Sequence, residues 1–173
     1  MIHSNLIYRK LKWLYFILII SSIDIASKKW VIQHLMLYEL RPIIPYFNFF
    51  YTHNYGLAFS LFSHKNSWYR WLLVGMTITI VIILLIKLYR TSINYKINQI
   101  AYVLLIGGAL GNLYDRICYG YVVDFIDFHI NNWHFATFNI ADSSIFIGTM
   151  FIVIGETMHL YDKNIKKKYI NKI

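Results

Sequence analysis

WLLVGMTITIVIILLI, residues 71–86, is a run of 16 residues without a charged side chain. A helix needs about 20 mostly apolar residues to cross a bilayer. Residues 97–114 form a second uncharged stretch of this kind, and residues 13–30 and 140–161 form two more that charged residues interrupt. The sequence therefore predicts a mostly α-helical integral membrane protein with four transmembrane helices, at about residues 13–30, 71–86, 97–114 and 140–161.

The composition agrees with a membrane protein. Of the 173 residues, 58% are hydrophobic and 14% are charged, whereas a soluble domain has about 25% charged residues. The single cysteine excludes a disulfide scaffold and a four-thiolate zinc site. The net charge of +9 arises from basic residues between the apolar stretches, which favours membrane topology over nucleic-acid binding. Residues 1–173 are expected to form one membrane domain, and nothing in the sequence demands more than a monomer.

The orientation follows from the basic residues. Eleven of the 17 Lys and Arg residues lie in residues 1–12, 87–96 and 162–173. Because cytoplasmic segments are rich in Lys and Arg, both termini are predicted to be cytoplasmic, and residues 31–70 and 115–139 to be extracytoplasmic. A cleaved signal peptide is the alternative for the first stretch, but Asp24 interrupts its apolar core and no A-x-A site follows.

The outer segments contain an aromatic, β-prone run, YFNFFYTH at residues 46–53. We expect a small sheet at the membrane face, with aromatic rings at the depth of the lipid headgroups. The alternative is an interfacial anchor without a catalytic part.

Five of the eight acidic residues gather at the outer ends of the predicted helices or beyond them: Asp24, Asp115, Asp124, Asp127 and Asp142. Ionisable groups in a membrane are costly and often functional. Asn112 and Arg116 are four residues apart and share a helix face, while Asp115 points elsewhere. They could present amide and guanidinium donors to one target, or they could simply end the helix.

Gly107 and Gly111 form a G-x-x-x-G pair in the same helix, which predicts the close approach of a neighbouring backbone.

Two aspartates could form a reactive pair. Asp124 lies in a short extended stretch at residues 122–129, and Asn139 is a natural N-cap that places Asp142 in the first turn of the last helix. Should Asp124 fold against Asp142, the two carboxyl groups would share a proton. Such a pair can activate water and polarise a carbonyl, which is general acid–base hydrolysis of an amide.

This chemistry needs neither a metal nor another cofactor. His129 and His134 could bind a metal ion together with Asp127, but no H-E-x-x-H motif or thiol pair accompanies them. Without a metal, Asp127 is expected to face water. Cys118 has no evident base beside it, so a passive thiol is expected.

Five stretches, in order, resemble the lipoprotein signal peptidases, also called signal peptidase II, which are aspartic endopeptidases of the bacterial inner membrane. They are Asp24-x-x-x-Lys28, Asn54-Tyr55-Gly56-Leu57-Ala58-Phe59, Gly111-Asn112-Leu113-Tyr114-Asp115-Arg116, Val122-Val123-Asp124-Phe125 and Phe138-Asn139-Ile140-Ala141-Asp142-Ser143.

The resemblance implies a substrate, a location and a set of roles. The substrate would be a diacylglyceryl-modified prolipoprotein, cut before its lipidated cysteine at the extracytoplasmic face. Asp124 and Asp142 would be the catalytic pair. The substrate backbone or the pair would be held by Asn54, Asn112, Arg116 and Asn139, with support from Asp24, Lys28, Gly56, Gly108 and Asp115. The outer part would be a small β-cradle with a covering helix within residues 31–70.

Two other functions fit parts of the pattern. A small proton-coupled carrier could use Asp24, Asp124 and Asp142 as a relay, although such a relay should be spread across the bilayer. A membrane adaptor without enzymatic activity would not depend on the acidic residues.

Overall fold

The computed structural model describes residues 2–56, 67–92 and 95–170. The described residues form four helices and four strands in the order α1 (Ile2–His34), β1 (Leu40–Ile44), β2 (Phe47–Asn54), α2 (Ser67–Arg90), α3 (Lys96–Cys118), β3 (Val122–Ile130), β4 (Trp133–His134) and α4 (Ile140–Ile170). Each apolar stretch lies within a longer helix, because the helices continue into their polar flanks. Residues 31–34 and 115–118, assigned above to the outer segments, are thus helical.

Three of the described helices are long and apolar enough to cross a membrane: Trp68–Arg90, Lys96–Cys118 and Ile140–His159. The helix α1 is not among them. Its apolar stretch contains Asp24, Lys28 and Lys29 within one and a half turns.

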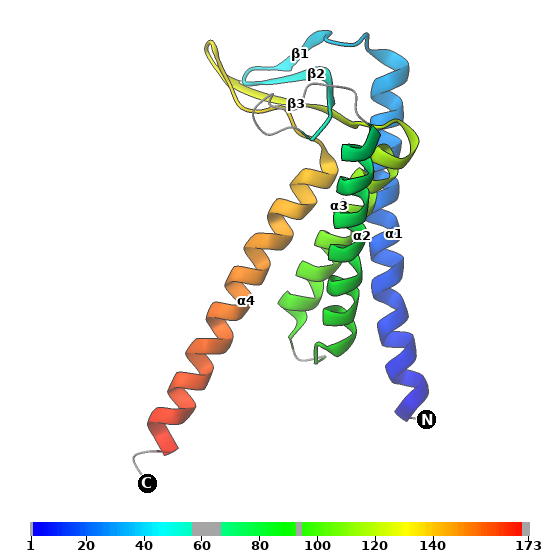
Figure 1. Cartoon of the computed structure of the whole chain (residues 1–173). Coiled ribbons are helices and arrows are strands. Elements are labelled where there is room, and N and C mark those ends of the chain that lie inside the picture. Colours follow the sequence, from blue (N-terminus) through cyan, green and yellow to red (C-terminus); the bar gives the residue numbers. More distant parts are fainter. Residues whose placement is uncertain (1, 57–66, 93–94, 171–173) are drawn as a thin grey trace.

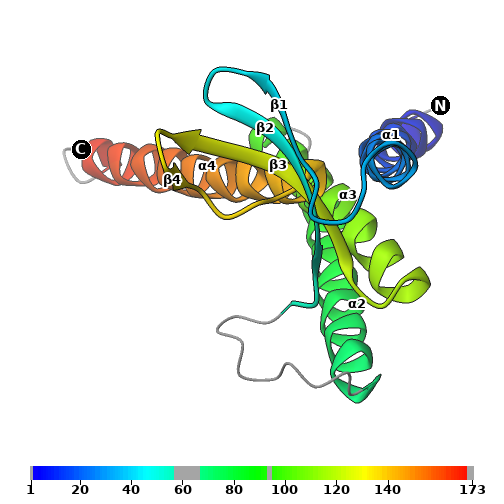
Figure 2. The same cartoon turned by 90° about the horizontal axis from the view of Figure 1, so that it is seen from above.

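The sheet lies at one end of the helices (Figure 1). The start of α1 and the end of α4 lie at the opposite end, together with the end of α2 and the start of α3. Seen from above, the strands extend across α3 and the start of α4 (Figure 2). The first turn of α4, which contains one acidic residue, Asp142, therefore lies under the sheet.

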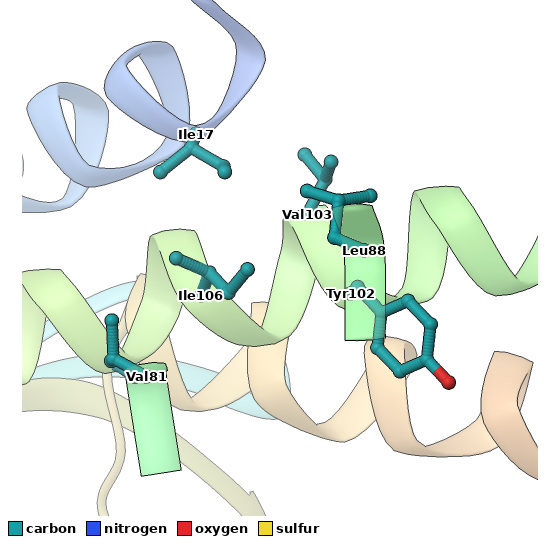
Figure 3. Close-up of a cluster of buried hydrophobic side chains, with 7 residues drawn as sticks. Ile17, Val81, Leu88, Tyr102, Val103 and Ile106 are labelled. Atoms are coloured by element: carbon teal, nitrogen blue, oxygen red, sulfur yellow. The ribbon is translucent and has the colours of Figure 1, made fainter. Parts of the chain in front are cut away.

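The helix α3 packs against each of the other helices. Its contacts with α1 and α2 form an apolar core, shown in Figure 3, of Ile17, Val81, Leu88, Tyr102, Val103, Ile106 and Ala109. A Cβ atom at Gly107 would lie 2.8 Å from the Cβ of Ile20 in α1. The close helix approach predicted from the G-x-x-x-G pair is therefore confirmed.

The four strands form one antiparallel sheet in the order β1-β2-β3-β4. The predicted sheet is therefore present, and the aromatic run supplies β2. A second apolar cluster ties this sheet to the end of α1 through Val31, Leu35, Tyr51, Val123 and Phe125. Within the described parts of residues 31–70, the only helical residues belong to the end of α1 and the start of α2, so no separate covering helix is found there. Residues 57–66, which include Leu57, Ala58 and Phe59 of the second motif, lie outside the described residues.

Candidate active site

Asp124 is the third residue of β3, where it pairs with Thr52 of β2. Its side chain is buried, with 2% of its surface exposed. The Nδ2 group of Asn54 donates to its Oδ2 over 2.9 Å, and the Nδ2 group of Asn139 donates to its Oδ1 over 2.6 Å. Both carboxyl oxygens of Asp124 therefore accept from amide groups.

Asp142 lies in the first turn of α4. The backbone N–H of Asp142 donates to the Oδ1 of Asn139 over 2.9 Å, and the backbone N–H of Asn139 donates to the Oδ2 of Asp142 over 3.3 Å. The predicted N-cap is confirmed, and it is reciprocal. A third amide, the Nδ2 group of Asn112, donates to the Oδ1 of Asp142 over 2.8 Å.

Asn139 therefore hydrogen-bonds to both aspartates and brings β3 and α4 together. Burial raises the pKa of Asp124 to about 6, against hydrogen bonds from Asn54 and Asn139 that lower it, and the negative charge of Asp142 adds to the increase. A carboxyl group with this pKa keeps its proton in weakly acidic surroundings, as a general acid requires.

A buried ion cluster lies next to these two aspartates. The Nζ of Lys28 lies 2.8 Å from the Oδ2 of Asp24 and 2.9 Å from the Oδ2 of Asp115, and all three side chains are at most 1% exposed. The carboxylates of Asp24 and Asp115 also accept hydrogen bonds from the backbone of α4 and β3. Asp24 accepts from the N–H of Ala141 at the start of α4 over 2.8 Å, and Asp115 accepts from the N–H of Val123 in β3 over 3.1 Å.

Asn112 connects the ion cluster to the aspartate pair. Its Oδ1 accepts from the Nζ of Lys28 over 2.8 Å and from the Nδ2 group of Asn139 over 3.2 Å. These two donors fix the orientation of the amide, so that its NH₂ group must face Asp142.

Arg116 is half-buried and lies within electrostatic reach of Asp142, Asp124 and Asp115. Among the described residues its guanidinium has no hydrogen-bond partner. Asn112 donates to Asp142, but Arg116 does not donate to the same carboxyl group. The structure thus brings Arg116 to the site with its donors available.

Two glycines allow close contacts at the site. Gly56 has a φ of +78°, a conformation that L side chains rarely adopt, and its N–H donates to the Oδ1 of Asn54 over 2.8 Å. This contact leaves the NH₂ group of Asn54 facing Asp124. A Cβ atom at Gly108 would collide with the carbonyl oxygen of Ala141, so this glycine lets α3 approach the first turn of α4.

Sequence reasoning missed the burial of Asp127. It was expected to face water, but its side chain is 2% exposed and contacts Asn48 and His134. The pairing of β2 with β3 buries it, and that register is not visible in the sequence. Among the described residues, no group of three His, Cys, Asp or Glu side chains is placed to hold a metal ion.

A cavity of about 1160 Å³ opens beside Asp142. Apolar side chains from the sheet, the segment before α4 and the first two turns of α4 form most of its lining: Phe128, Ile130, Trp133, Phe135, Phe138, Phe146 and Ile147. We call this cavity the apolar groove.

Known proteins resemble this chain in sequence and in fold. Residues 16–158 match the family model described as signal peptidase (SPase) II. The chain belongs to the signal peptidase II family. It is 46% identical over 158 residues to a lipoprotein signal peptidase of Serratia proteamaculans (strain 568), covering 91% of this chain and 94% of that relative. It is 48% identical over 143 residues to a lipoprotein signal peptidase of Yersinia enterocolitica serotype O:8, covering 83% and 85%.

Two solved structures have the same fold. One is described as a bacterial membrane enzyme at 2.3 Å resolution and superimposes with a TM-score of 0.77, at 31% identity, over 88% of this chain and 91% of that one. The other, at 1.9 Å resolution, has a TM-score of 0.73 at 32% identity, over 83% and 90%. The peptidase is therefore a multi-pass membrane hydrolase of the aspartic type that removes signal peptides from prolipoproteins. These similarities do not support the alternative function of a small proton-coupled carrier.

Proposed function

We propose that Asp124 and Asp142 are the catalytic pair and that the peptidase cuts diacylglyceryl-modified prolipoproteins before the lipidated cysteine. The observation that carries the proposal is that Asn139 hydrogen-bonds to both aspartates at the end of the helices that bears the sheet.

The surroundings of the two aspartates differ, and the difference assigns their roles. Asp142 lies at the N-terminus of α4, where the helix dipole favours a negative charge, and it accepts from Asn112. Asp124 lies in β3 with its side chain buried, and its pKa is about 6. A bound substrate removes more water and disfavours its charge further. Asp142 is therefore the base and Asp124 the acid.

The reaction then proceeds without a covalent enzyme intermediate. Asp142 takes a proton from a water molecule as the water oxygen attacks the scissile carbonyl carbon, while Asp124 donates its proton to the carbonyl oxygen. The tetrahedral intermediate collapses when Asp124 recovers that proton and Asp142 passes its own to the amino group of the cysteine. The C–N bond breaks, and both aspartates return to their starting states.

The neighbouring donors orient the pair and the substrate. Asn54, Asn112 and Asn139 hold the carboxyl groups in place. Arg116 is the donor that remains for a substrate carbonyl, because its guanidinium makes no hydrogen bond to the described residues.

Cleavage occurs at the extracytoplasmic face in this proposal. The sheet and the aspartates lie at the end of the helices opposite to both chain ends. Residues 1–12, 87–96 and 162–173 contain 11 of the 17 Lys and Arg residues, which favours a cytoplasmic location for these segments.

We also propose that α1 is a fourth transmembrane helix. Lys28 and Asp24 neutralise each other while buried, and Asp115 of α3 completes the cluster, so these charges do not face lipid. Lys29 lies over the ring of Tyr114, 5.8 Å from its centroid. The charges that set α1 apart from the other helices therefore have partners within the protein.

Purified peptidase in detergent, mixed with a diacylglyceryl-modified prolipoprotein, tests the catalytic assignment. Wild-type protein should release the signal peptide, and Asp124→Asn and Asp142→Asn should each reduce kcat at least about 10³-fold, within the range of a lost general acid or base. Glu39→Gln is the matched control, because Glu39 pairs with Arg41 away from the site. Cleavage by either asparagine variant at more than a tenth of the wild-type rate would refute the assignment.

Labelling of intact cells tests the topology. In a Cys118→Ser background, Asn131→Cys should react with a membrane-impermeant maleimide, because residue 131 lies in the β3–β4 turn. Reaction only after the membrane is opened would place the sheet in the cytoplasm.

A further inference from the structure

We propose that Asp127 and His134 are positioning residues that hold one wall of the apolar groove, the wall formed by Trp133 and Phe135. They thereby control how tightly the lipid-modified substrate binds. This inference rests on the proposed function. It concerns two side chains that make no hydrogen bond to Asp124 or Asp142.

Asp127 is a buried carboxyl group with two polar partners. It lies directly opposite Asn48 in the pairing of β2 with β3, and the Nδ2 group of Asn48 donates to its Oδ2 over 2.8 Å. The Nδ1 of His134 lies 2.9 Å from the same oxygen and 3.0 Å from Oδ1. An ionised carboxylate only accepts hydrogen bonds, so His134 is the donor in this contact, whether its ring is neutral or charged.

The contact lies behind the wall of the groove. Side chains of successive residues in an extended strand point to opposite faces. Trp133 and Phe135 line the apolar groove, and His134 between them faces the other side of the sheet and reaches Asp127. An anchored His134 thus fixes the direction of both aromatic neighbours.

The wall is short and largely exposed. The strand β4 has only two residues and pairs with β3 through two partner pairs. Trp133 and Phe135 are 63% and 55% exposed. Backbone hydrogen bonds, such as Phe135 N–H to the carbonyl of Phe128 over 2.8 Å, also hold this segment, and the ring of His134 stacks on that of His129 with centroids 5.1 Å apart. The rings of Trp133 and Phe138 contact that of Phe135. Among the described residues, the side-chain hydrogen bond of residues 133–135 is the one between His134 and Asp127.

The groove begins at Asp142, so its wall lies beside the place where the scissile bond is held in the proposed function. A wall that moves loosens the fit of the apolar substrate without displacing either catalytic aspartate. The expected kinetic effect is on KM, with kcat retained.

The first experiment is steady-state cleavage of a diacylglyceryl-modified prolipoprotein in detergent. His134→Ala should raise KM about tenfold, within the effect of a lost hydrogen bond to a charged group, and change kcat less than about twofold. His134→Asn should restore most of the lost affinity, because its Nδ2 group can donate from nearly the same place as Nδ1. His34→Ala is the control. Among the described residues, the imidazole of His34 hydrogen-bonds to the carbonyl of Trp30 and stacks on the ring of Trp30, at the end of α1 and away from the groove.

A double-mutant cycle tests whether His134 acts through the wall. Trp133→Ala should itself raise KM, and His134→Ala should add little in that background, because residues that act through one element are not additive. Additive effects would mean that His134 acts elsewhere and would overturn the inference.

Other outcomes are equally decisive. An unchanged KM in His134→Ala, or a fall in kcat without a change in KM, would overturn the inference, and so would a His134→Asn variant that is stable but no better than His134→Ala. Each of these results leaves the proposed function intact when wild-type protein cleaves the substrate and Asp124→Asn does not. Failure of the wild-type protein to cleave would instead reject the proposed function.

Discussion

Two groups of buried acids lie side by side in this protein, and they differ in how their charge is balanced. Asp24 and Asp115 share the ammonium group of Lys28, at 2.8 and 2.9 Å. Asp124 and Asp142 accept from the side-chain amides of three asparagines. Asn112 belongs to both groups, because its oxygen accepts from Lys28 and its NH₂ group donates to Asp142.

The difference supports a structural role for one group and a reactive role for the other. An ammonium group within hydrogen-bond distance favours the charged form of a neighbouring carboxyl group, which opposes the retention of a proton. Amide donors orient a carboxyl group without supplying a full charge, so burial and the neighbouring carboxylate can raise the pKa of Asp124 to about 6. The ion cluster fixes backbone, and the amide-bound pair retains a proton to transfer.

Removing the cation should have the largest effect on stability. Lys28→Met leaves Asp24 and Asp115 buried without a counter-charge, and breaking a buried ion pair in this way costs about 3–5 kcal/mol. Thermal or denaturant unfolding in detergent measures the loss. Lys29→Met, at the neighbouring exposed lysine, should change stability by less than about 1 kcal/mol. Equal effects of the two substitutions would contradict the structural role of the cluster.

Asn112→Asp separates the two groups at the residue that they share. The substitution keeps an oxygen for Lys28 but replaces the NH₂ donor that faces Asp142. Cleavage should fall about 100-fold, because a repulsive acceptor now faces the proposed base. The melting temperature should fall less than in Lys28→Met, because Lys28 keeps an oxygen partner at residue 112. A large loss of stability with normal cleavage would reverse the assignment.

Gly108→Ala tests the close approach of α3 to the first turn of α4, which contains Asp142. The added Cβ collides with the carbonyl oxygen of Ala141, so the variant should lose about 1–3 kcal/mol of stability. Gly75→Ala in α2 is the control. A Cβ there meets nothing within 4 Å among the described residues, and alanine is the better helix former. A neutral Gly108→Ala would show that the helices can separate freely.

The smallest expected effect is on the pH profile. Proton loss from Asp124 removes the acid, so kcat/KM should fall as pH rises past about 6. The hydrogen bond from Asn54 favours the ionised form and lowers the pKa of Asp124. Asn54→Ala should therefore move the alkaline limb to higher pH, by less than about one unit. A shift to lower pH would show that another group controls the limb.

The sequence allowed prediction of the features that depend on local pattern. Uncharged stretches predict the helices, the aromatic run predicts β2, and Asn139 followed by Asp142 predicts the capped start of α4. Each of these signals lies within a few residues of the structure that it specifies.

The features that the sequence did not specify depend on tertiary contacts. Asp24 and Lys28 are one helical turn apart, so their pairing is visible in the sequence, but nothing near Asp115 indicates that it shares the same lysine. Asp127 is buried only because β2 pairs with β3 in the register that places Asn48 opposite. The helices α1 and α3 also continue beyond the apolar stretches, to His34 and Cys118.

The central claim is that Asp124 is catalytic and Asp115 is structural, although both are buried aspartates of the same region. Cleavage and unfolding measured on Asp124→Asn and Asp115→Asn test it directly. Because burial raises the pKa of Asp124 in the folded state, its contribution to stability is present below about pH 4 and is lost as pH rises through about 6. Asp124→Asn should therefore lose less stability than Asp115→Asn at neutral pH, while its kcat should fall at least about 10³-fold. Asp115→Asn should keep more than about a tenth of the activity. Cleavage by Asp124→Asn at more than a tenth of the wild-type rate would contradict the account.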